Sequence, residues 1–122
     1  MYMVGGPHVN KSDAQRLLEK FISERQSLVT DAEVLQEILH RFGAIQRRDA
    51  IQAAFNALLG VVEEVLPVDR VAVERAKEIV LGYSGLSARD AVHLAVMEYH
   101  GIDRILSFDS GFDQFPGVTR LS

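Results

Sequence analysis

The sequence contains no cysteine, no long apolar run and no excess of positive charge. Without cysteine, a disulfide framework and a thiolate metal site are excluded, and nothing indicates an oxidising compartment. No apolar run approaches the about 18 residues that cross a bilayer, and residues 1–7 lack the basic and apolar regions of a signal peptide. We therefore expect a cytoplasmic protein with no membrane partner.

The net charge of −4 bears on nucleic-acid binding. Proteins that hold nucleic acid mainly by neutralising phosphates are usually basic, so this type of binder is not expected. A metal-dependent nuclease is not excluded by the same charge. Its carboxylates gather around cations, and the bound cations attract phosphate.

The 122 residues have the composition of one globular domain over 1–122, with 48% hydrophobic and 25% charged residues. Helical patterns alternate with short β-branched runs, and no internal repeat interrupts them. This alternation predicts an α/β fold with a short parallel sheet and helices on both faces. Strands are expected over 27–30, 61–68, 104–108 and 118–121.

A first helix is expected to start after Asn10 or Ser12 and to run to about Glu24. Further helices are expected after three N-capping side chains, Asp31, Asp69 and Ser87. A further helix is expected over 48–59. Glycines can end helices by adopting a left-handed conformation, which predicts ends at Gly43, Gly60 and Gly101. In the helix after Asp69, the residues expected to face the core are Val73, Ala76, Ile79 and Val80.

Three acidic residues are candidates for chemistry, and each also has a structural interpretation. Asp109 follows a predicted strand, where parallel sheets bind ligands, but Asp-Ser-Gly is also a common turn. Asp90 closes a capping box with Ser87, a role compatible with binding a cation. Glu37 borders the apolar stripe of its helix and is spaced to pair with Arg41.

Taken together, the surroundings of these acids resemble one family. The three segments are Val29–Ile38 around Glu37, Leu86–Ala95 around Asp90, and Ile105–Asp113 around Asp109. In order, spacing and flanking apolar residues they resemble the PIN-domain ribonuclease toxins of the VapC type, with the most specific match around Asp90. The resemblance extends from about Tyr2 to the C-terminus.

This resemblance implies a PIN-like α/β/α sandwich and a metal-dependent endoribonuclease, the toxin of a toxin–antitoxin pair. It implies that Glu37, Asp90 and Asp109 are catalytic and bind Mg²⁺ or Mn²⁺, with RNA as substrate and a cognate antitoxin as partner. Arg89, beside Asp90, is placed to reach a phosphate at the rim of the site. His8, His40, His93 and His100 show no metal-ligand spacing and are interpreted as structural.

The sequence departs from the family at its N-terminus. The family begins with a central strand that ends in an aspartate, whereas Tyr2–Gly6 resembles the end of the helix that follows that strand. We therefore expect the first strand and its acid to be missing and cleavage to be weak. The strands on either side of the gap are expected to pair with each other, or with a second copy of the chain in a homodimer. Asp31 is either a helix cap or a replacement carboxylate.

Two other interpretations stay open. The chain could be a binding module that engages an antitoxin or its own copy without cleaving RNA. It could also be an unrelated α/β domain whose acids serve only as caps and turns.

Overall fold

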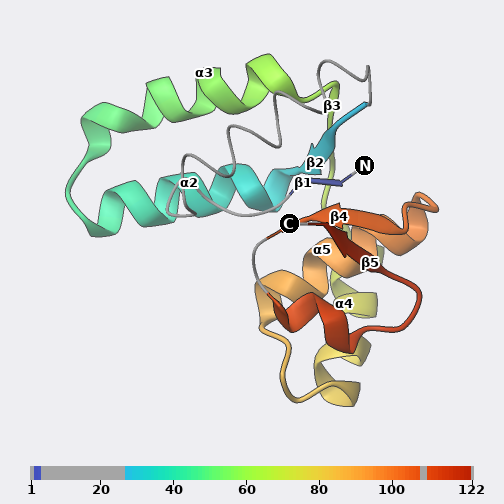
Figure 1. The fold of residues 1–122 in the computed structure, drawn as a ribbon. Coiled ribbons are helices and arrows are strands. Elements are labelled where there is room, and N and C mark those ends of the chain that lie inside the picture. The colour runs from blue at the N-terminus through green and yellow to red at the C-terminus, as the bar shows by residue number, and fades with distance from the viewer. Residues whose placement is uncertain (1, 4–26, 108–109, 122) are drawn as a thin grey trace.

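Five short strands form one parallel sheet in the computed structural model, which describes residues 2–3, 27–107 and 110–121. The strands are β1 (Tyr2–Met3), β2 (Val29–Asp31), β3 (Glu64–Leu66), β4 (Arg104–Leu106) and β5 (Thr119–Leu121). Their order across the sheet is β3-β2-β1-β4-β5, and every pairing is parallel (Figure 1). The predicted α/β class and its parallel sheet are confirmed.

The centre of the sheet is occupied by β1. Tyr2 pairs with Val29 of β2 on one side and with Ile105 of β4 on the other. The expectations of a missing central strand and of direct pairing between β2 and β4 are therefore wrong. A strand of two residues is too short to show a hydrophobic period, so the sequence pattern could not reveal it. Neither residue of β1 is acidic, so β1 does not supply the carboxylate that the family carries at this position.

Three helices begin at the side-chain caps that the sequence predicts. Asp31, Asp69 and Ser87 each accept a hydrogen bond from a backbone N–H in the first turn. The described helices are α2 (Ala32–Ala44), the short η1 (Arg48–Ala50), α3 (Ile51–Val61), α4 (Arg70–Gly82), α5 (Ala88–Tyr99) and the short η2 (Ser110–Gln114). The helix predicted over about 12–24 lies outside the described residues. Among those described, no helix is both long and apolar enough to cross a membrane.

Two of the three predicted helix ends are wrong. Gly43 and Gly60 lie inside α2 and α3, and Gln46 adopts the left-handed conformation after α2, with φ of 57°. A glycine inside a helix costs only about 1 kcal/mol relative to alanine, so a glycine by itself does not end a helix. Gly101, with φ of 68°, follows α5 as predicted.

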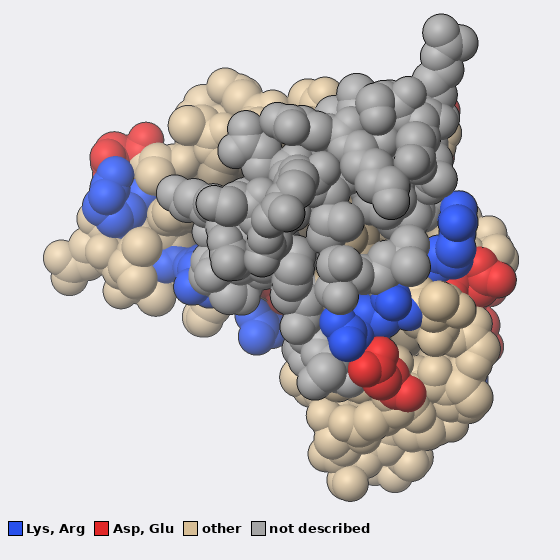
Figure 2. Space-filling model, viewed as in Figure 1, with Lys and Arg blue, Asp and Glu red and all other residues tan. Residues whose placement is uncertain are grey.

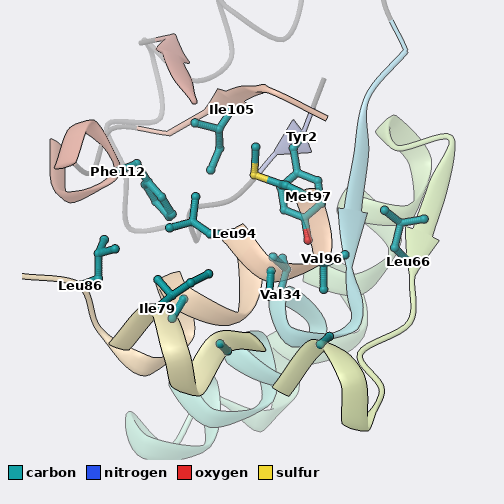
Figure 3. Packing of buried hydrophobic residues seen from close by; sticks show 14 residues of the cluster. Tyr2, Val34, Leu66, Ile79, Leu86, Leu94, Val96, Met97, Ile105 and Phe112 are labelled. Carbon is teal, nitrogen blue, oxygen red and sulfur yellow. The ribbon is translucent and has the colours of Figure 1, made fainter. Parts of the chain in front are cut away.

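The hydrophobic core lies between the sheet and the helix pair α4–α5 (Figure 3). Ile79, Leu94, Met97 and Ile105 are each at most 1% exposed. The largest fully buried side chains come from both helices of this pair, from the central strands and from η2, and they include Tyr2 and Phe112. Because α5 packs among them, it is held against the sheet. The helices α4 and α5 lie together, while α2 and α3 form a hairpin that extends away from them (Figure 1).

The prediction for α4 is only partly confirmed. Ala76 and Ile79 are buried, but Val73 and Val80 are exposed by 50% and 36%. The buried stripe of α4 instead passes through Ala72, Ala76 and Ile79, at the spacing of one helical face. Val73 and Val80 each lie one position beyond that stripe.

Candidate active site

A buried carboxylate, Asp31, joins the end of β2 to the start of α2. Its Oδ1 accepts a hydrogen bond of 3.1 Å from the backbone N–H of Val34, which confirms the predicted helix cap. Its Oδ2 accepts hydrogen bonds from the Tyr2 hydroxyl and from His93 Nδ1, the latter at 2.7 Å. Both oxygens are thus occupied by protein donors in a fully buried position, which does not favour Asp31 as a replacement metal ligand.

His93 connects Asp31 to the candidate acid Glu37. This α5 side chain is buried, with Nδ1 facing Asp31 and Nε2 lying 3.9 Å from Glu37 Oε1. Burial disfavours the charged imidazole, but the contacts with Asp31 and Glu37 outweigh burial and raise the pKa of His93 to about 9. His93 is therefore a buried cation between two carboxylates at neutral pH.

Glu37 faces α5 from the middle of α2. Its side chain is 19% exposed, and Oε1 lies 3.3 Å from a guanidinium nitrogen of Arg89. The sequence left open a pair with Arg41 on the same helix, but the ion pair in the structure crosses to α5. The first turn of α5 and the middle of α2 therefore meet at Glu37.

Asp90 lies in that same first turn of α5. Its backbone N–H donates a hydrogen bond of 3.1 Å to Ser87 Oγ, so the predicted N-cap at Ser87 is confirmed. Arg89 precedes Asp90, and His93 lies three residues after it on the same helical face. Both of these neighbours contact Glu37. The structure thus brings the segment that carries Asp90 against Glu37.

Asp109 lies outside the described residues, but the segments on either side of it are anchored. Ser107, which follows β4, is buried, and its carbonyl accepts a hydrogen bond of 3.3 Å from Arg120. Phe112 in η2 is 1% exposed, and Arg120 also pairs with Asp113 at 3.0 Å. The described residues on both sides of Asp109 are therefore linked to β5 through Arg120.

Negative charge is concentrated around Glu37. Burial first, and then the neighbouring carboxylates of Glu37 and Asp31, raise the pKa of Glu33, while His93 and Arg89 act in the opposite direction. Sequence reasoning missed Glu33 and the connection through His93. The available signal was helical spacing, since Glu33 precedes Glu37 by one turn and His93 follows Asp90 by one turn.

Carboxylate oxygens are the donors that Mg²⁺ and Mn²⁺ prefer, so the chemistry of Glu37 and Asp90 fits a hard divalent cation. Within the described part of the chain, no three histidine or acidic side chains are grouped to hold a metal ion. A donor set of three acids would therefore need an acid from outside the described residues, and Asp109 is the one that the sequence predicts. Glu37 already pairs with two cationic side chains, His93 and Arg89, so its position favours positive charge.

A family model described as PIN domain matches residues 1–118. The chain is 60% identical over 122 residues to ribonuclease VapC13 of Mycobacterium tuberculosis, covering 100% of this chain and 93% of that protein. It is 34% identical over 109 residues to ribonuclease VapC23 of the same species, covering 89% and 86%.

Solved structures show the same fold. The crystal structure of Mycobacterium tuberculosis VapC20, a sarcin–ricin loop cleaving toxin, has a TM-score of 0.69 and 25% identity, covering 93% of this chain and 94% of that one. VapBC2 from Rickettsia felis, bound to a promoter DNA fragment, has a TM-score of 0.74 and 12% identity, covering 98% and 96%. The second likeness concerns the fold alone.

The match over almost the whole chain defines the class of protein as a PIN domain. Within that class, the chain belongs to the family of VapC ribonucleases. The predicted resemblance to PIN-domain toxins of the VapC type is thereby confirmed.

Proposed function

We propose that this protein is a metal-dependent endoribonuclease and the toxin component of a toxin–antitoxin pair. The family supports ribonuclease activity, and VapC20, a relative in both sequence and fold, is a toxin that cleaves the sarcin–ricin loop. The observation that carries the proposal is the placement of Glu37 against the first turn of α5, where Asp90 lies.

In this proposal Glu37, Asp90 and Asp109 hold Mg²⁺ or Mn²⁺. The metal, when bound, polarises the phosphodiester and provides an activated water. Ser87 fixes the backbone of Asp90, and the cap on α5 places that carboxylate at the positive end of the helix. The buried Asp31–His93 pair holds the side of Glu37 that faces the protein interior.

The distribution of charge supports a role for the metal in attracting RNA. In the view of Figure 2, basic side chains lie at intervals along the described part of this face, and acidic side chains adjoin several of them. With a net charge of −4, this chain gains little from general phosphate neutralisation. A cation at the acidic cluster supplies the local positive charge that a phosphate requires.

The partner in this proposal is a cognate antitoxin, as the resemblance to the toxin family implies. We also propose a homodimer. Strand exchange at the centre of the sheet does not support it, because β1 lies between β2 and β4. Large apolar side chains on α2, on α3 and directly after α2 are exposed and available to a protein partner: Leu39, Leu59 and Ile45.

The direct test is cleavage of RNA by the purified chain in Mn²⁺ and in EDTA. We expect cleavage only with Mn²⁺, and expect Glu37→Gln and Asp109→Asn each to reduce it strongly. Glu74→Gln is the matched control, because it removes one exposed negative charge on α4, away from the site. Cleavage that persists in EDTA, or equal activity in Glu37→Gln and Glu74→Gln, would contradict the proposed site.

A second candidate is a binding module of the same fold that does not cleave RNA. It is favoured by one observation: neither residue of the central strand β1 is acidic, whereas the resemblance implies a metal-binding aspartate at the end of this strand. A titration with Mn²⁺ separates the two candidates. The binding module predicts no saturable Mn²⁺ binding that depends on Glu37, whereas the nuclease requires it.

A further inference from the structure

Glu37 has two cationic partners, and they differ in their freedom to move. The side chain of His93 is 2% exposed and is held by its 2.7 Å hydrogen bond to Asp31. The side chain of Arg89 is 59% exposed and contacts Glu37 from the solvent side, at 3.3 Å. His93 cannot leave without opening the core, whereas Arg89 can rotate away at little cost.

The position of Arg89 in its helix is unfavourable. It is the second residue of α5, where the helix macrodipole is positive and favours anions rather than cations. The 3.3 Å separation is also longer than the 2.7–2.9 Å that is typical of a strong charged hydrogen bond. Arg89 is thus held near Glu37 mainly by a weak, solvent-exposed ion pair.

We propose that Arg89 is an exchangeable counter-ion of Glu37, which neutralises this carboxylate in the metal-free protein and turns to a phosphate of the RNA when a divalent cation binds. The inference rests on the proposed function, in which Glu37 is a metal ligand. It assigns to Arg89 the positioning of the substrate, and to His93 the permanent support of Glu37.

The exchange follows from the charges. A divalent cation on Glu37 repels the guanidinium beside it and interacts more strongly with the carboxylate than Arg89 does. The released guanidinium has a planar set of donors that matches two phosphate oxygens. Because Arg89 lies next to Asp90 in the chain, a phosphate that it binds lies beside the acids of the site.

In Arg89→Gln, the proposal predicts tighter binding of Mn²⁺ but weaker binding of RNA. Mn²⁺ affinity without RNA, measured by electron paramagnetic resonance of free Mn²⁺, should rise about two- to fivefold, because a competing exposed ion pair is removed. The KM for RNA cleavage at saturating Mn²⁺ should rise, with little change in kcat. The slope of log(kcat/KM) against log[salt] should become shallower by about 0.7, the value for one lost contact with a single strand.

Two control variants separate this role from general effects. Arg70→Gln removes the same charge from the corresponding turn of α4, where Arg70 pairs with Glu74 at 2.9 Å, and should leave Mn²⁺ affinity and KM unchanged. Arg89→Lys keeps the charge and should keep Mn²⁺ affinity near that of the parent protein. A destabilised fold would lower Mn²⁺ affinity and could not raise it.

The outcomes also distinguish this inference from the proposed function. If Glu37→Gln weakens Mn²⁺ binding but Arg89→Gln leaves it unchanged or weaker, the exchange is refuted and the metal site stands. If Arg89→Gln raises Mn²⁺ affinity without changing KM, the contact with RNA is refuted. If Glu37→Gln has no effect on Mn²⁺ binding, the inference and the proposed metal site fail together.

Discussion

The helix pair α4–α5 and the helix hairpin α2–α3 are built in opposite ways. Six residues of α5 are buried, from Ala91 to Met97, whereas none of the residues of α3 is buried. Only Val34 and Ile38 of α2 are buried, both near Glu37. Among these helices, α5 therefore buries the most residues and should contribute most to stability. The hairpin packs on the rest of the fold mainly through the part of α2 that forms the candidate site.

The largest expected effect is the loss of a core side chain in α5. Leu94→Ala should lower the free energy of unfolding by about 4 kcal/mol, because Leu94 is 1% exposed and its removal leaves a cavity. Leu59→Ala on α3 should change it by less than about 0.5 kcal/mol, since Leu59 is 48% exposed. Urea denaturation measures both. Equal losses would mean that the two regions contribute equally to stability.

Raising the pH should weaken the contacts of His93 in α5 with Asp31 and Glu37. The folded-state pKa of His93, about 9, lies above the ordinary value of 6.5, so its stabilisation is complete below pH 6.5 and is lost as pH rises through 9. The total is about 3 kcal/mol from a shift of this size.

Thermal or urea unfolding in EDTA between pH 6 and 10 measures this loss without bound metal. His93→Gln should remove most of the pH dependence in that range. A pH dependence that is unchanged in His93→Gln would assign it to other groups.

A substitution at Asp90 should separate activity from stability. Asp90→Asn should lower Mn²⁺-dependent cleavage about a hundredfold, equivalent to about 2.7 kcal/mol, because the amide lacks the charge that a hard cation requires. Stability should change by less than about 1 kcal/mol, since asparagine keeps the polar character of this turn and the Ser87 cap uses only the backbone N–H. RNA cleavage and urea unfolding test the two halves; full activity would leave Asp90 a structural residue only.

The smallest expected effect concerns the central strand. Tyr2→Phe removes the hydroxyl that donates to Asp31 and should cost about 1–2 kcal/mol of stability, because a buried acceptor loses one partner. Tyr99→Phe is the control, since Tyr99 is 77% exposed and its change should be near zero. Equal unfolding free energies for the two variants would show that the Tyr2 hydroxyl is dispensable.

Local rules explain what the sequence could predict. The caps Asp31, Asp69 and Ser87 depend on contacts within three residues, so their chemistry alone identifies three helix starts. The burial of Val73 and Val80 was predicted wrongly because both belong to an apolar pattern wider than the face that α5 covers.

The candidate site also has one part that the sequence predicts and another part that depends on how the helices pack. Glu37, Asp90 and Asp109 were proposed from a family resemblance that the comparisons confirm, and their metal-binding role stays a prediction. The contacts that hold Glu37 come from Arg89 and His93 on another helix. No local pattern encodes such long-range contacts, because they depend on how the helices pack.

The hydrogen bond between Asp31 and His93 joins residues 62 positions apart, and it has a consequence for synthesis on the ribosome. The second residue of the chain needs β4, which ends at Leu106, to complete its pairing in the sheet. Contacts between such distant segments form late in folding. A nascent chain therefore forms the buried contact between Asp31 and His93 only after α5 has been synthesised, and it completes the pairing of Tyr2 only after β4 has followed.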